Sequence, residues 1–187
     1  MHHDYVLFIT HLGARDTAIL DALSLMPEVS VCYNEFFFTS PQSLTDLANA
    51  CNRQKEARIY LGVLRKNINL QTKDLYDLCK FIYFVSNPID ALNHLINIKK
   101  YHPNQALNHY KHRLERMCLM SKYTDGILAT NDNCDGLSKF LKLKRELHLI
   151  KTDQELTKFI SNKILYEAQM IYDYYVPKIK SRCLKSY

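Results

Sequence analysis

Short apolar runs alternate with amphipathic stretches along this chain of 187 residues. The apolar runs predict strands at residues 4–11, 29–33, 57–64, 80–85 and 126–130. The intervening stretches predict helices at 15–26, 41–54 and 71–78, from 88 onward, at 103–120 and 137–141, and from 152 to 175. Strands that alternate with helices predict an α/β protein, a three-layer sandwich around a parallel sheet. The run at 80–85 is the most hydrophobic, which is typical of a central strand buried on both faces.

The bulk composition is that of an ordinary globular domain. Apolar residues make up 47% of the chain and charged residues 24%. No apolar run approaches the roughly 20 residues that cross a bilayer. The first apolar run is short and no Lys or Arg precedes it, so no signal peptide is predicted. We expect one domain over residues 1–187, in a soluble cytoplasmic protein without a membrane partner.

Cysteines, histidines and charge narrow the chemistry further. The six cysteines form no C-x-x-C pair, and we expect reduced, mostly buried thiols. Histidines pair at helical spacing at 109 and 112, but no acidic partner completes a metal site, and we expect no metal. The net charge of +6 suits a nucleotide, an anionic glycan or a nucleic acid, although a modest basic excess is most often only a solvated surface.

Three segments are expected to meet at one edge of the sheet. Ligands of parallel α/β sheets bind beyond the carboxyl ends of the strands. That edge holds the turn near Gly13, the pair Asn34–Glu35 and the pair Ser86–Asn87. The free N–H groups of the first turn and of the helix after it favour an anion such as phosphate. The sequence therefore predicts an anion site at this edge.

The order of these segments resembles the sulfotransferases that use 3′-phosphoadenosine-5′-phosphosulfate (PAPS). The stretch 23–29, Leu-Ser-Leu-Met-Pro-Glu-Val, is similar to the His-Pro-x-Val step that follows the first helix of the family. Asn87-Pro88 after an apolar strand and the helix end at 135–143 also match in order. The resemblance implies a P-loop-like nucleotide-transferase topology, with the strands at 5–11 and 80–86 side by side.

The resemblance also implies that the first turn grips the 5′ side of PAPS, through Gly13, Ala14, Arg15, Asp16 and Thr17. An ungapped count places Gly13 where the family has a basic residue, and a turn shortened by two residues would bring Arg15 there instead. Asp16 puts a carboxylate beside the expected phosphate, and like charges repel. The alternative is that Asp16 or Thr17 simply caps a helix.

The 3′ side is expected after the strand at 80–85. In the family, an Arg before Asn/Asp-Pro and a Ser eight residues later hold the 3′-phosphate. Here Ser86 stands at the Arg position, Asn87 is retained, and His94 stands at the Ser position. Loss of the guanidinium removes a charged, bidentate phosphate ligand, for which Arg58 or Arg65 are candidate replacements.

Two functions remain open. In the first, a divergent sulfotransferase transfers sulfuryl from PAPS to a hydroxyl of a glycan or small molecule, with Glu35 as general base and Arg15 neutralising the donor. In the second, the same fold is a non-catalytic binding module, or a subunit of a protein or nucleic-acid assembly. A phosphoryl-transfer P-loop enzyme is disfavoured because the chain has no Gly-Lys pair.

Overall fold

The computed structural model contains one five-stranded sheet in which all strands are parallel, in the order β2-β3-β1-β4-β5. The strands are β1 (Asp4–Ile9), β2 (Val29–Glu35), β3 (Ile59–Leu64), β4 (Lys80–Val85) and β5 (Gly126–Thr130). The structure describes residues 4–11, 16–35, 42–51, 57–65, 76–131, 133–134, 136–147 and 160–183. The prediction that the strands near 5–11 and 80–86 are neighbours is confirmed, because β1 pairs with β4.

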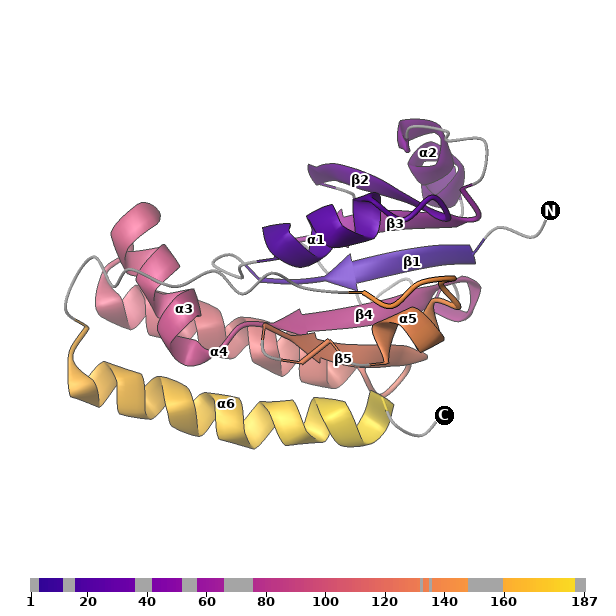
Figure 1. The fold of residues 1–187 in the computed structure, drawn as a ribbon. Helices are drawn as coiled ribbons and strands as arrows, with labels where there is room; N and C mark the ends of the chain where they lie inside the picture. Colours follow the sequence, from indigo (N-terminus) through magenta and orange to yellow (C-terminus); the bar gives the residue numbers. More distant parts are fainter. Residues whose placement is uncertain are drawn as a thin grey trace.

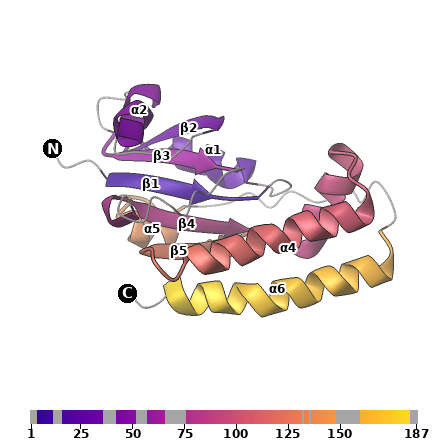
Figure 2. The ribbon, with the colours of Figure 1, turned by 180° about the vertical axis from the view of Figure 1, so that it is seen from behind.

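Helices cover both faces of this sheet (Figures 1 and 2). One face carries α1 (Thr17–Ser24) and the short α5 (Leu137–Phe140). The other carries α2 (Gln42–Ala50), α3 (Pro88–Asn93), α4 (Pro103–Met120) and α6 (Asn162–Cys183). A π-helical turn, η2 (His94–Ile98), continues α3. The predicted α/β class with three layers is therefore observed.

The strands separate two apolar cores. On β1, Val6 and Phe8 pack with α1 and α5, while Leu7 and Ile9 pack with the helices of the opposite face. This alternation is the two-residue period of a strand buried on both sides. Phe8 stacks on Phe84 of β4, with 5.5 Å between the ring centroids, so the two central strands are joined by side chains as well as backbone.

The last helix differs from its prediction. It was expected at 152–175, but Ile160 and Ser161 are not helical, and α6 begins at Asn162 and ends at Cys183. Ser161 starts the helix, since its hydroxyl accepts the N–H of Ile164 at 3.4 Å. The prediction for residues 152–159 lies outside the described residues, and the last eight residues of α6, 176–183, were not predicted. Pro177 is a residue that usually disfavours a helix interior. Here the proline lies inside α6 and is exposed.

The remaining boundaries agree within a few residues, apart from the predicted helix at 71–78. Of that segment only 76–78 lies among the described residues, and it forms a 3₁₀ turn. None of the six cysteines, all within the described residues, forms a disulfide, and five of them are buried, as expected. Among the described helices, none is both long enough and apolar enough to span a bilayer.

Candidate functional site

The carboxyl ends of the strands bring together residues that are far apart in the chain. Because the strands are parallel, the residues that follow them lie along one edge. His11 comes after β1, Arg65 after β3, Ser86 after β4 and Asn131 after β5. All four side chains are at least half-buried, and each enters one of several groups of hydrogen bonds and ion pairs along this edge. We call these residues and their partners the carboxyl-edge network.

The centre of the network joins β1 to β4. The backbone N–H of Ser86 donates to Nε2 of His11 at 3.1 Å. The hydroxyl of Tyr110, from α4, donates to the carbonyl oxygen of Ser86 at 2.9 Å. Since Nε2 of His11 accepts a hydrogen bond, this imidazole is neutral and holds its proton on Nδ1. The His11 ring also meets the Tyr110 ring edge-on, with 5.4 Å between centroids.

A second part of the network closes the ends of β4 and β5. Asn87 caps α3, because its side-chain oxygen accepts the N–H of Asp90 at 2.9 Å. One carboxylate oxygen of Asp90 accepts from the amide of Asn87 and from the amide of Asn131, both at 3.0 Å. The Ser86 hydroxyl is 3.4 Å from the side-chain oxygen of Asn131. Asp90 therefore holds the start of α3 against the end of β5.

A buried arginine fastens the ends of β1 and β3. Arg113 of α4 donates through Nε to the carbonyl oxygen of Thr10 at 2.8 Å. It donates through a terminal nitrogen to the carbonyl oxygen of Leu64 at 3.0 Å. Leu64 is the last residue of β3 and Thr10 directly follows β1, and the planar fork of a guanidinium reaches both carbonyls at once. Arg113 is thus an internal brace of the edge.

The last part of the network is an ion pair at the start of α1. Asp16 holds the N-cap position without a side-chain capping bond, and its carboxylate lies 3.3 Å from the Arg65 guanidinium. Burial raises the pKa of Asp16 above its ordinary value, although the charge and hydrogen bonds of Arg65 act in the opposite direction. The Asp16 side chain is 6% exposed and that of Arg65 30%. Arg65 is the partner that solvent reaches.

The predicted site residues fall in different places. Thr17 is the exposed first residue of α1, and Glu35 is the last residue of β2, with its side chain outside the described part. Ser86 and Asn87 belong to the network, whereas His94 lies beyond the far end of α3, half-buried at the start of η2. Three predicted residues lie outside the described residues: Gly13, Ala14 and Arg15.

The two candidate replacements for the missing arginine are now distinguished. Arg58 precedes β3, at the opposite edge of the sheet, where its guanidinium donates to the carbonyl oxygen of Lys142. Only Arg65 follows β3 at the carboxyl edge. Its second contact is with the carbonyl oxygen of Tyr33 in β2, at 3.5 Å. The positive charge of Arg65, which follows β3, is therefore present at this edge, but it forms an ion pair with Asp16.

Sequence reasoning missed five members of the network: His11, Asp90, Tyr110, Arg113 and Asn131. His11 and Asn131 directly follow strands, so the rule that selected Ser86 would also have selected them. Asp90 lies three residues after the Asn87 cap, a spacing at which acidic side chains are common in capped helices. Arg113 has no local signal, since its partners are 103 and 49 positions away.

The network is built to hold the edge together. Ser86 is 0% exposed and His11 1%, so neither side chain is open to an acceptor hydroxyl. In the parts of the chain that the structure describes, no cluster of three His, Cys, Asp or Glu side chains is placed to hold a metal ion. No protein-family model matches the chain, and no curated protein matches it either.

Proposed function

We propose that this chain is a sulfotransferase-like α/β protein that keeps the family framework but does not bind PAPS productively, and that it acts as a non-catalytic binding module. Support for the framework is the pairing of β1 with β4 and the Asn87-Pro88 start of α3 after β4. We propose the sulfotransferase topology for the whole chain. We infer a non-catalytic function because protein groups occupy the part of this edge where the resemblance would place the donor nucleotide.

The observation that carries the proposal is the buried carboxylate of Asp16. It occupies the N-cap of α1, where the resemblance expects a donor phosphate, and it is paired with Arg65. Two like unit charges about 4 Å apart near a protein surface repel by about 4 kcal/mol. A phosphate at this position would meet that repulsion and would also compete with Asp16 for the guanidinium. Both effects weaken nucleotide binding.

The expected 3′ side is closed in a different way. Ser86 replaces the family arginine and is completely buried. Its N–H, carbonyl oxygen and hydroxyl are used by His11, Tyr110 and Asn131. A ligand phosphate would have to break these bonds to be held there. At the position of the family arginine, internal hydrogen bonds of Ser86 thus stabilise this edge of the sheet without a ligand.

A second candidate, an active sulfotransferase, is favoured by one observation. Glu35 ends β2 opposite Val63 of β3, and Arg65 follows β3, so the proposed base and a cation come from neighbouring strands. In that mechanism Arg65 leaves Asp16 and neutralises the donor, while Glu35 takes the proton of the acceptor hydroxyl. The sulfuryl group would pass in line from PAPS to the acceptor oxygen, and adenosine 3′,5′-bisphosphate would leave. No covalent enzyme intermediate would form.

Thermal melting with adenosine 3′,5′-bisphosphate, the desulfated donor, tests the proposal. A site filled at about 100 times its Kd would gain roughly 2.7 kcal/mol, which corresponds to a Tm increase of about 5–10 °C for a chain of this size. We expect less than about 2 °C at millimolar ligand, a small fraction of that increase. Asp16→Asn should enlarge the shift, and Arg65→Met in that background should remove it.

The matched control is Asp46→Asn, which neutralises an exposed carboxylate on α2. This variant should melt with the same ligand shift as the unmodified chain. Two results together would establish the enzyme instead. One is a full Tm increase in the unmodified chain, and the other is transfer of a labelled sulfuryl group from PAPS to an acceptor, with the transfer abolished by Arg65→Met.

A further inference from the structure

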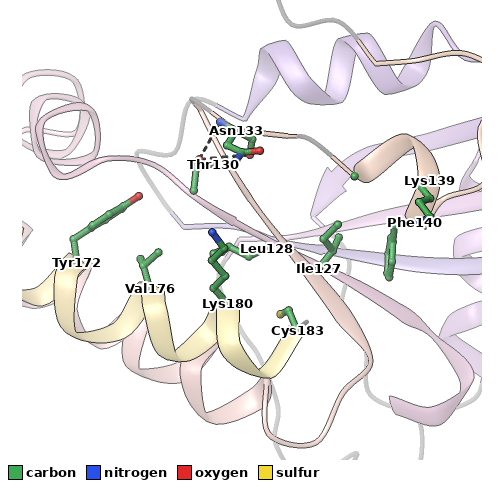
Figure 3. Close-up of a pocket in the computed structure, with 11 residues that line it drawn as sticks. Ile127, Leu128, Thr130, Asn133, Lys139, Phe140, Tyr172, Val176, Lys180 and Cys183 are labelled. Atoms are coloured by element: carbon green, nitrogen blue, oxygen red, sulfur yellow. Dashed lines mark hydrogen bonds between the residues drawn. The ribbon is translucent and has the colours of Figure 1, made fainter. Parts of the chain in front are cut away.

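A cavity of about 400 Å³ lies along the outer edge of β5, between α5 and α6 (Figure 3). Tyr172, Val176 and Lys180 project from α6 toward the strand. Its size falls in the lower part of the range of small-molecule sites. The described residues that line it come from β5, from α5 and the turn before it, and from α6: Ile127, Leu128, Thr130, Asn133, Gly136, Lys139, Phe140, Tyr172, Val176, Lys180 and Cys183.

The cavity lies beside β5, the last strand of the sheet, where the helices α5 and α6 cover opposite faces. Among the described residues, no strand pairs with the outer side of β5. Ile127 packs toward the α5 layer and Leu128 toward the α6 layer, so the lining wraps around the edge of the sheet. The space between the layers is therefore open from the side, next to the end of β5 but away from Asp16 and Arg65.

The lining combines apolar walls with two cations. Ile127, Phe140 and Val176 are among the apolar lining residues. Lys180 extends from α6 toward β5, whereas Lys139 lies on α5 beside Phe140 (Figure 3). No acidic side chain is among the described lining residues, and the described part of the chain offers neither lysine an ion pair. An apolar cavity with cations among its described lining residues complements an apolar molecule with a negative group.

We infer that this cavity is a binding site for a small ligand with an apolar body and one anionic group, of the class of medium-chain carboxylates. The apolar body would lie along Ile127, Phe140 and Val176, and the carboxylate would pair with Lys180, which extends from α6 toward β5 (Figure 3). Burial of the body supplies most of the affinity, and the ion pair selects the negative head group.

A peptide strand fits the cavity less well. Alternate residues of a strand direct their N–H and C=O groups to the same side, and here the outward set is Gly126, Leu128 and Thr130. Thr130 already exchanges hydrogen bonds with Asn133 through N–H groups and carbonyl oxygens, at 2.8 and 3.2 Å. That leaves the backbone of two residues for an added strand, too few for the main-chain bonding by which peptides bind sheet edges.

Decanoate below its micelle concentration is the probe, with decanol as its uncharged counterpart. Isothermal titration should show decanoate binding to the unmodified chain and decanol binding about fivefold or more weakly, the size of one partly exposed ion pair. Lys180→Met should weaken decanoate binding to a similar degree and leave decanol binding unchanged. Lys163→Met, an exposed lysine at the start of α6, is the matched control and should bind as the unmodified chain.

Methyl NMR of the unmodified chain locates the ligand without relying on any variant. Decanoate should shift the methyl signals of Ile127, Leu128 and Val176, while Met170, which is 56% exposed elsewhere on α6, should not respond. Equal binding of decanol and decanoate, or shifts confined to Met170, would overturn the inference. Shifts of the three methyl groups that depend on protein concentration alone would overturn it too, because a second copy of the chain would then fill the cavity.

Discussion

The guanidinium of Arg65 lies 3.3 Å from the carboxylate of Asp16 and joins the carboxyl end of β3 to the start of α1. This pair occupies the place where a parallel α/β sheet usually meets its ligand. Arg65 is the more exposed partner of the pair, at 30% against 6% for Asp16. Because Asp16 is buried, its protonation should be visible in the stability of the fold.

Asp16→Asn should stabilise the chain increasingly as the pH rises from about 4 to 7. Burial raises the pKa of Asp16 in the folded state above its value in the unfolded chain. At a pH between the unfolded and the folded pKa of Asp16, the folded chain binds more protons than the unfolded chain. The stability that this proton supplies is therefore lost as the pH rises through the folded pKa. Urea unfolding of both proteins at each pH measures the difference.

The Asp46→Asn variant again serves as the control, since it removes the same charge from an exposed position. Its difference from the unmodified chain should stay nearly constant over this pH range. A stability difference for Asp16→Asn that shrinks with rising pH would show that Arg65 outweighs the cost of burial.

Arg113→Met should destabilise the fold by about 2–5 kcal/mol. The substitution keeps most of the apolar stem but removes two hydrogen bonds from a charged donor, to the carbonyl oxygens of Thr10 and Leu64. The Leu64 oxygen still accepts the N–H of Thr10 at 3.1 Å, and a hydrogen bond to a charged group contributes about 1.5–3 kcal/mol. Urea unfolding gives the change. Lys111→Met, on an exposed position of the same helix, should alter stability by about 0.5 kcal/mol or less. A near-neutral Arg113→Met would mean that water takes over both bonds.

The sequence was informative about the sheet because its signals are local. The apolar run at 80–85 identifies a strand buried on both faces, and Asn87-Pro88 marks the start of α3 because cap and first turn lie within two residues. The C-terminal end of α6 was harder to predict from the sequence. Pro177 interrupts the pattern that usually defines a helix, and only packing of the flanking Val176 and Ile179 against the core shows that the helix continues.

The candidate site was predictable only as a location. Parallel strands place Ser86 and the start of α1 at one edge, which follows from chain order alone. The partner of each polar group depends on tertiary packing. Nothing near Asp16 in sequence indicates Arg65, 49 positions away, and nothing near Ser86 indicates that its N–H meets His11. The chemistry of the edge therefore required the fold.

Gly126→Ala should destabilise the chain by about 1–3 kcal/mol through overpacking. A Cβ at this position would lie 2.8 Å from the carbonyl oxygen of Phe81 and 3.0 Å from the Tyr83 ring, within the paired strands β4 and β5. The comparison is Gly136→Asn, where φ is +85° and a Cβ would lie 3.4 Å from Cδ1 of Ile127. Asn tolerates this left-handed backbone, so thermal melting should show the smaller loss there.

Thiol labelling of the native chain should show one fast cysteine. Cys134 is half-exposed, whereas the other five are buried. Burial raises the pKa of Cys79 and of Cys183 to about 12, and that of Cys51 to about 11. Because the thiolate is the reactive form, a thiol of pKa 12 is deprotonated in roughly one molecule in ten thousand at about pH 8.

Intact-mass measurement should therefore show a single rapid addition, which Cys134→Ser removes. The remaining additions should become fast only in denaturant, when burial no longer disfavours the thiolate or blocks the reagent. The matched control is Cys32→Ser, which removes a buried thiol on β2 and should leave the rapid addition in place. Rapid native labelling of Cys79 would mean that the core between β4 and its covering helices opens readily, contrary to the packing described above.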